Sequence, residues 1–171
     1  MLALRGAVFP RRPGRIDGFT YIGLHRYSVT ICTHLRKSIF ADRTSIDPVL
    51  TTIRQCAGSF GFAIHAYCFM LDHVHLVVAA TGEQSDFQRF MSSWKQRAGY
   101  QHKQLTGESL WQESYYDHVL RDDEEMAGAV RYALENPVRK GLVREFLEYP
   151  HSGSDVYGKE QLKEFWQIKQ G

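Results

Sequence analysis

The segment that covers residues 62–80 constrains the fold more than any other part of this chain. It contains two largely apolar runs that meet at Leu71-Asp72. Two residues leave room only for a tight turn, so the runs are expected to be neighbouring strands that pair antiparallel. Neither run reaches the length needed to cross a membrane. The sequence therefore predicts an antiparallel sheet built around this hairpin.

Helical and extended patterns alternate around the hairpin. Residues 27–33 are rich in β-branched side chains and predict a strand. Asp47-Pro48, an N-cap residue followed by proline, predicts the start of a helix that ends near residue 58. Ser85 and Gln88 have the spacing of a capping box and predict the start of a second helix.

The second half of the chain completes the pattern. Residues 109–120 predict a fourth strand, and the acidic run 122–125 suits the N-terminal end of a third helix. That helix is expected to stop at Asn136-Pro137, because a residue before proline avoids helical geometry. Residues 159–167 suggest a short final helix. The order indicates an α+β, ferredoxin-like βαββαβ fold. We expect helices on one face of its antiparallel sheet, an additional C-terminal helix and a tail, with the second face open for a site.

The 171 residues, 43% of them apolar, suit one compact domain. We divide the chain into an N-terminal arm (1–20), a central domain (21–150) and a C-terminal tail (151–171). The three cysteines are widely spaced and odd in number, which indicates reduced residues and not a disulfide framework. The start lacks a signal-peptide core, and no apolar run is of membrane-spanning length. A soluble cytoplasmic protein is the expectation.

Positive charge is concentrated near the N-terminus. The net charge is only +2, but residues 1–40 contain seven basic residues against one acidic residue. Within the arm, Arg11, Arg12 and Arg15 suit a surface that binds phosphates. The alternative is a solvated, flexible tail.

His73-Val74-His75 is the clearest chemical signal. Side chains alternate along a strand, so the two imidazoles point to one face while Val74, Leu76 and Val78 point to the other. Neutral imidazoles at this spacing can each offer a nitrogen to a divalent metal. Two incidental surface histidines are the alternative interpretation.

Tyr132 and Asn136 form a second signal on the third predicted helix. They are four residues apart, so they lie on one face, one turn from each other. Tyr132 lies off the apolar stripe that contains Val130 and Leu134. An Asn oxygen beside two imidazoles would suit Mg²⁺ or Mn²⁺. The alternative is a half-buried surface tyrosine and an ordinary helix-end asparagine.

The chain resembles the REP-associated tyrosine transposases, relatives of the single-tyrosine transposases of the smallest bacterial insertion sequences. Five ordered segments within about residues 20–155 carry the resemblance. The segment 67–78 contains the family's His-hydrophobic-His motif, and 27–33 is similar to its first strand. Residues 110–121 resemble its Trp-Gln…Tyr-Asp-His block, and 132–138 (Tyr-Ala-Leu-Glu-Asn-Pro-Val) its nucleophile helix. The segment 149–154 is similar to its C-terminal part.

This resemblance implies both residue roles and a reaction. Tyr132 would be the nucleophile, and His73, His75 and Asn136 would bind Mg²⁺ or Mn²⁺. The implied activity is cleavage and rejoining of single-stranded DNA with hairpin structure, of the kind formed by repetitive extragenic palindromes (REP), through a 5′-phosphotyrosine. A covalent intermediate keeps the bond energy, so no nucleotide cofactor is required. Both a monomer and a homodimer with exchanged helices are compatible with the resemblance.

Further side chains are candidates for contact with DNA. Lys95 and Arg97, on the polar side of the second predicted helix, suit phosphate contacts, or else are solvated surface charges. Trp111 and Tyr116 are candidates for stacking on bases, and His118 shares a strand face with Tyr116.

Three points remain open from sequence alone. Tyr115 and Tyr116 are rivals to Tyr132 as nucleophile, although neither has a ligand-like partner one turn away. A hairpin-binding protein that no longer cuts DNA is one alternative function. A His-metal phosphodiesterase that uses water, with Tyr132 incidental, is the other.

Overall fold

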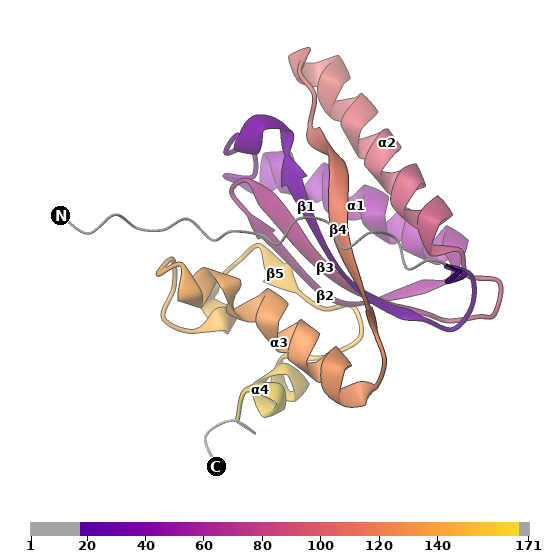
Figure 1. The fold of residues 1–171 in the computed structure, drawn as a ribbon. Helices are drawn as coiled ribbons and strands as arrows, with labels where there is room; N and C mark the ends of the chain where they lie inside the picture. The colour runs from indigo at the N-terminus through magenta and orange to yellow at the C-terminus, as the bar shows by residue number, and fades with distance from the viewer. Residues whose placement is uncertain (1–17, 168–171) are drawn as a thin grey trace.

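An antiparallel sheet of five strands organises the protein (Figure 1). The structure is a computed structural model that describes residues 18–167. The strands occur in the spatial order β4-β1-β3-β2-β5 and are β1 (Arg26–Thr33), β2 (Phe62–Met70), β3 (His73–Ala80), β4 (Trp111–Leu120) and β5 (Ser152–Gly153). The helices are α1 (Arg43–Phe60), α2 (Phe87–Thr106), α3 (Asp123–Arg139) and α4 (Lys159–Gln167), with two short 3₁₀ turns, η1 (His34–Arg36) and η2 (Phe146–Glu148). The predicted ferredoxin-like βαββαβ order is confirmed.

The main core lies between the sheet and the pair α1 and α2. Val74, Leu76 and Val78 of β3 point into it, as their alternation predicts, and are fully buried. Phe90 and Trp94 of the α2 stripe pack in the same core. α1 and α2 therefore cover one face of the sheet, as expected.

The opposite face is not left open, because α3 packs against it over β2 and β3 (Figure 1). Val77 of β3 and Ala66 of β2 form a second core with Val130 and Leu134 of α3. The β1–β4 part of this face is less covered, and His118 is exposed there. One helix on the second face thus encloses the His73–His75 side of β3.

A bulge in β2 decides which of its side chains reach this second face. The register of β2 against β3 shifts between Ile64 and Ala66. Ile64 packs in the main core before the shift, whereas Ala66 packs in the second core after it, and Cys68 is the direct neighbour of His75. Since side chains alternate strictly in a regular strand, only the bulge allows this change of face.

Three predicted helix boundaries were wrong, and side-chain capping explains two of them. α1 begins at Arg43, because Asp42 accepts hydrogen bonds from the backbone N–H groups of Thr44 and Ser45 at 2.9 and 3.3 Å. The predicted cap, Asp47-Pro48, lies inside the helix. α2 is capped by Asp86 and not by Ser85.

Ser85 has a different role from the predicted one. Its Oγ donates to the carbonyl of Gly61 at 2.7 Å. Gly61 ends α1 with a φ of +72°, and an added Cβ would lie 2.8 Å from Ser85 Oγ. This contact ties the end of α1 to the start of α2 and explains the glycine.

The third wrong boundary is the end of α3, which continues through Pro137 to Arg139. Proline has no N–H to donate to the carbonyl of Ala133, four residues earlier. The side chain of Asn136 lies 3.5 Å from that carbonyl oxygen. An asparagine before the proline thus offers a substitute donor, and the helix persists.

The segment predicted to be a tail is joined to the domain over its described part. Two residues of β5 pair with β2, and Asp155 accepts hydrogen bonds from Arg54 of α1 at 2.9 and 2.6 Å. Leu162 of α4 is buried against the second core. The predicted helix at 159–167 is confirmed as α4.

Candidate active site

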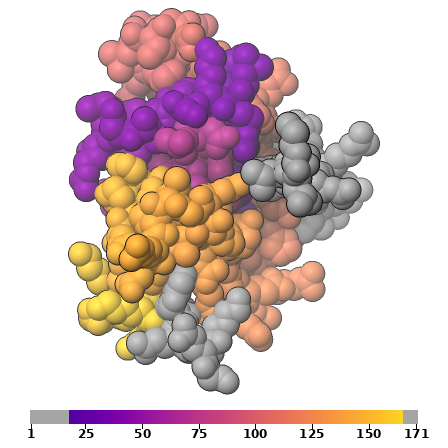
Figure 2. All heavy atoms as spheres, turned by 90° about the vertical axis from the view of Figure 1, so that its left-hand side faces the viewer, coloured from indigo at the N-terminus to yellow at the C-terminus, as the bar shows by residue number. Residues whose placement is uncertain are grey.

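The site is assembled where α3 crosses the His73–His75 face of β3. The two imidazole rings are nearly perpendicular, with centroids 4.9 Å apart. They are only 4% and 3% exposed, so they are not the incidental surface histidines of the alternative interpretation. Figure 2 views the molecule from this side, with α3 in orange and the indigo N-terminal elements above it.

Each histidine is held through its Nδ1 atom. His73 Nδ1 lies 2.6 Å from Asp72 Oδ1, and Asp72 in turn forms an ion pair with Arg36 at 3.0 Å. His75 Nδ1 lies 3.0 Å from Thr30 Oγ1 on β1. Such partners orient a ring and leave its Nε2 to bind a metal.

His75 Nε2 is buried, and within the described residues it makes no hydrogen bond of good geometry, although the Asn136 amide is close enough to affect the ring. A buried nitrogen in this state is costly unless something binds it. A buried imidazole nitrogen in this position fits a divalent cation as its partner.

Burial keeps both imidazoles neutral. It lowers the pKa of His73, although the neighbouring Asp72 carboxylate opposes this effect. The pKa of His75 falls to about 3, mainly through burial and further through the charges of His73 and Arg139. A neutral imidazole is the form that binds a metal.

Tyr132 lies on α3 directly above His75. The two rings are perpendicular, with centroids 5.7 Å apart, and Tyr132 is 51% exposed. The Arg139 guanidinium lies 4.0 Å from the centre of the tyrosine ring and also donates to the Tyr132 carbonyl at 3.0 Å. The ring is thus held between a cation and an imidazole and remains accessible from solvent.

Asn136 lies one turn below Tyr132 and is 6% exposed. Its Nδ2 lies 3.0 Å from the Tyr132 carbonyl and 3.5 Å from that of Ala133. Its amide also interacts with His75 and opposes the fall of the histidine's pKa. With the nitrogen turned to the helix carbonyls, the oxygen Oδ1 is the end that is left for a ligand.

These residues fit a divalent cation in one particular way. No group of three His, Cys, Asp or Glu side chains within residues 18–167 is arranged to hold a metal. A site here would need the amide oxygen of Asn136 as its third protein ligand, beside His73 and His75. The unpartnered Nε2 of His75 and the neutral state of both rings meet that requirement.

Cross-strand pairing brings Tyr116 into the same row of side chains. His75 of β3 is opposite Thr30 of β1, and Thr30 is opposite Tyr116 of β4. His118 is opposite Ser28, one position further along the same face. Tyr115 points the other way and packs against the main core. Tyr115 is therefore separated from the histidines by the sheet, and of these two rivals it is Tyr116 that shares a face with Tyr132.

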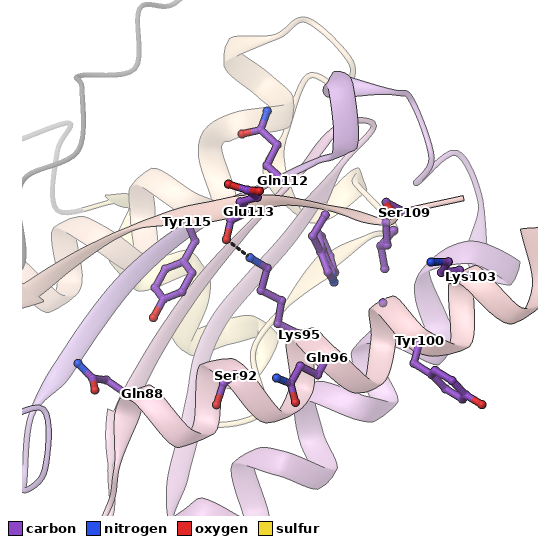
Figure 3. A pocket seen from close by; sticks show the side chains of 13 residues that line it. Gln88, Ser92, Lys95, Gln96, Tyr100, Lys103, Ser109, Gln112, Glu113 and Tyr115 are labelled. Carbon is purple, nitrogen blue, oxygen red and sulfur yellow. Dashed lines mark hydrogen bonds between the residues drawn. The ribbon is translucent and has the colours of Figure 1, made fainter. Parts of the chain in front are cut away.

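The remaining predicted DNA contacts do not gather at this site. Trp111 is 8% exposed and packs on Trp94 with centroids 5.6 Å apart, in the core on the sheet face away from Tyr132. Lys95 of α2 points toward β4, where its Nζ donates to a backbone carbonyl (Figure 3). Arg97 is exposed, on the side of α2 nearer Cys56 of α1. The arginines of the arm, Arg11, Arg12 and Arg15, lie outside the described residues.

Sequence reasoning missed Thr30, Asp72 and Arg139. Asp72 is adjacent to His73 in the chain, and Arg139 follows Tyr132 by seven residues, or two helical turns. Both residues could therefore have been identified from their spacing in the sequence. Thr30 could not be identified in this way, because only the register of β1 on β3 brings it to His75.

The ferredoxin-like sheet has two histidines on its central strand, and α3 places a tyrosine and an asparagine beside His75. Residues 22–132 match the family described as "Transposase IS200 like". The family match places this chain in the class of DNA-processing enzymes. The chain belongs to this family of IS200-like transposases.

Individual relatives agree with this assignment. A candidate REP-associated tyrosine transposase of Haemophilus influenzae is 23% identical over 145 residues, which cover 78% of this chain and 81% of that protein. The REP-associated tyrosine transposase of Escherichia coli K12 is 26% identical over 95 residues, 53% of each chain. The solved structure of a REP-associated tyrosine transposase bound to a REP hairpin superposes with a TM-score of 0.67 at 20% identity and covers 81% of both chains.

One further finding concerns membranes: none of the helices in the described part of the chain is both long and apolar enough to cross one. The cysteines have no disulfide partners, and Cys56 and Cys68 are buried, as the sequence predicts.

Proposed function

We propose that this protein is a divalent-metal-dependent endonuclease and strand transferase that cleaves and rejoins single-stranded, hairpin-forming DNA through Tyr132. The observation that carries the proposal is the meeting of four side chains from two distant elements. Tyr132 and Asn136 of α3 both contact His75 of β3, and the His75 ring contacts that of His73. The alternative of an ordinary surface tyrosine does not account for a ring held between His75 and Arg139.

The reaction assigned to Tyr132 is a phosphoryl transfer. Its Oη forms a bond to phosphorus and the bond from phosphorus to the 3′ oxygen breaks. The phenol gives its proton to solvent, and the leaving 3′ oxygen takes one up from solvent. The products are a 5′-phosphotyrosine and a free 3′-hydroxyl. Attack by a 3′-hydroxyl reverses the step, rejoins the strand and regenerates the tyrosine, so no nucleotide cofactor is consumed.

The protein's own residues prepare this step. Arg139 holds the Tyr132 ring over the site, and His75 supports the ring from the sheet side. His73, His75 and Asn136 would hold the cation, either Mg²⁺ or Mn²⁺. When bound, such a cation polarises the phosphate and offsets the charge that develops on its oxygens.

Hairpin DNA is the proposed partner because a relative of the same fold is seen with a REP hairpin. Tyr116 and His118 extend the site along the uncovered β1–β4 part of the sheet, where a strand of DNA would leave the nucleophile. The basic arm with Arg11, Arg12 and Arg15 is proposed as an additional phosphate contact.

A denaturing-gel assay tests the proposal. Labelled hairpin DNA from beside the gene is incubated with Mg²⁺ or Mn²⁺ and the wild type, Tyr132→Phe or Tyr116→Phe. We expect a metal-dependent covalent adduct that Tyr132→Phe abolishes and Tyr116→Phe, the matched control on the same sheet face, retains.

Other outcomes select the alternatives. Loss of the adduct only in Tyr116→Phe would move the nucleophile to β4. Binding without an adduct under either metal would favour a hairpin-binding protein that does not cut. Cleavage that survives Tyr132→Phe would favour a phosphodiesterase that uses water.

A further inference from the structure

Lys140 is the residue at which α3 ends. Its backbone N–H is bonded to the carbonyl of Asn136, one turn earlier. Tyr132, Asn136 and Lys140 are spaced by four residues each, so they follow one another along one side of the helix. Because the sequence predicts the end of this helix at Asn136, only the structure shows that Lys140 belongs to the same side as the proposed nucleophile.

The direction of α3 decides where Lys140 lies relative to the histidines. Asp123, at the start of α3, forms an ion pair with Arg26 at 2.6 Å, and Arg26 is paired with the last part of β3. Further along the helix, Tyr132 contacts His75. The helix therefore runs antiparallel to β3, from the last residues of the strand toward its first residue, His73.

The charge of Lys140 confirms that the helix ends close to His73. Burial is the main cause of the lowered pKa of His73, and the nearby charge of Lys140 lowers this pKa further. Tyr132 and Lys140 therefore lie at opposite ends of the histidine pair, with Tyr132 at His75 and Lys140 at His73. Eight residues of α-helix span about 12 Å, so a phosphate has room between the two side chains.

The side chain of Lys140 is available to a substrate. It is exposed, and within residues 18–167 its ammonium group makes neither a hydrogen bond nor an ion pair. Two other cations near the histidines are already engaged, since Arg139 contacts the Tyr132 ring and Arg36 forms an ion pair with Asp72. A guanidinium also stays protonated in proteins, whereas an ammonium can release a proton. Of these three cations, Lys140 is the one that can act as an acid.

The proposed attack by Tyr132 requires an acid at this end of the site. In a phosphoryl transfer the attacking and leaving oxygens lie roughly in line, on opposite sides of the phosphorus. Tyr132 attacks from the His75 end, so the leaving 3′ oxygen points toward the His73 end. Negative charge develops on this oxygen as its bond to phosphorus breaks, and a proton donor placed beside it lowers the barrier.

We infer that Lys140 is the catalytic residue that protonates the leaving 3′ oxygen. As the bond from phosphorus to this oxygen breaks, the oxygen takes a proton from the Lys140 ammonium, and solvent reprotonates the amine. In the rejoining step the amine accepts the proton of the attacking 3′-hydroxyl, because the reverse reaction follows the same path. The inference rests on the proposed strand transfer at Tyr132 and supplies its proton donor.

The test uses a leaving group that needs no proton donor. The cleavage site is first mapped on ordinary hairpin DNA, and a second substrate then carries sulfur in place of the 3′ bridging oxygen at that site. A thiol is far more acidic than an alcohol, so the thiolate leaves without being protonated. Formation of the covalent adduct by the full chain is followed by rapid quench on both substrates, with Mn²⁺ throughout.

Lys140→Met removes the donor and retains a side chain of similar length. Since Lys140 is exposed, the variant is expected to fold, which circular dichroism checks. We expect adduct formation on ordinary DNA to slow by about 100-fold or more, as for loss of a general acid, and to stay close to the wild-type rate on the sulfur-containing DNA. Lys140→Arg retains the charge but cannot release a proton, so it should be nearly as slow on ordinary DNA.

Two further variants serve as controls. Lys163→Met replaces an exposed lysine of α4 and should react like the wild type with both substrates. Arg139→Ala acts on the nucleophile and not on the leaving group, so the sulfur substitution should not restore its rate.

Three outcomes would overturn the inference while the wild type still forms its adduct. The first is an unchanged rate of Lys140→Met on ordinary DNA. The second is an equal loss on both substrates, which would assign Lys140 to phosphate binding alone. The third is a rate restored by Lys140→Arg, which would show that charge suffices. A wild type that forms no adduct with either DNA would instead contradict the proposed function, and this inference with it.

Discussion

The buried, neutral state of His75 is expected to make the folded protein sensitive to acid. Burial lowers the pKa of this imidazole from 6.5 to about 3 in the folded chain. Below about pH 6.5 the unfolded chain therefore takes up a proton that the folded chain refuses. The stabilisation by His75 is complete above pH 6.5 and is lost as the pH falls toward 3.

The size of the effect follows from the linkage of protonation to unfolding. Each pH unit below 6.5 lowers the free energy of unfolding by about 1.36 kcal/mol for one such group. The loss is about 2 kcal/mol between pH 6.5 and about pH 5, and its limit near pH 3 is on the order of 5 kcal/mol. Since a small domain is stable by roughly 5–15 kcal/mol, a loss of 2 kcal/mol is readily measured.

The assay is urea unfolding, followed by circular dichroism without metal, at a series of pH values from about 7.5 to about 5. His75→Gln retains a polar side chain beside Thr30 but cannot be protonated in this range. We expect its free energy of unfolding to fall less steeply with acid than that of the wild type. His73, whose pKa is also lowered by burial, is present in both proteins.

His118→Gln, at the exposed end of β4, is the control for the effect of replacing a histidine by glutamine. Parallel curves for wild type and His75→Gln would refute the reasoning. They would mean that His75 is protonated in the folded protein as easily as in the unfolded one, and the case for a ready metal ligand would weaken with it.

Three further predictions concern α3 and the sheet beneath it. Arg139→Ala removes the cation above the Tyr132 ring. It should slow adduct formation in a rapid-quench assay by about 2- to 30-fold, the factor that corresponds to the usual free energy of a cation–π contact. An unchanged rate would contradict a positioning role for Arg139. Asn136→Asp replaces a hydrogen-bond donor with an acceptor that faces helix carbonyls, so the free energy of unfolding of the metal-free protein should fall by about 1–3 kcal/mol. Added Mn²⁺ should restore part of this loss. A higher melting temperature of the variant without metal would be evidence against this account. Burial raises the pKa of Cys68 and of Tyr149 to about 12. The unfolded chain therefore loses these protons at a lower pH than the folded chain, and the free energy of unfolding should fall as the pH rises from about 9 toward 12. A free energy of unfolding that stays constant over that range would exclude the effect.

Local patterns predicted the elements of this protein well where one side-chain period dominated. The alternation of His73, Val74 and His75 correctly separated a polar face from a core face, because a strand has only two faces. The helical stripe with Val130 and Leu134 correctly excluded Tyr132 from the core. Helix starts were predicted less well, because Asp42 and Asp86 cap the helices that Asp47 and Ser85 were expected to begin.

The sequence by itself therefore determined the order of elements, the composition of each face and the family, all of which depend on neighbours in the chain. Only the tertiary structure decided which groups meet. The register of β1 on β3 brings Thr30 to His75, and the packing of α3 brings Asn136 to the histidines. The same packing of distant segments buries Trp111 and opens a cavity beside it. Contacts between residues far apart in the chain depend on the register of the strands and on how the helices pack against the sheet. The local spacing of apolar and polar residues specifies neither of these.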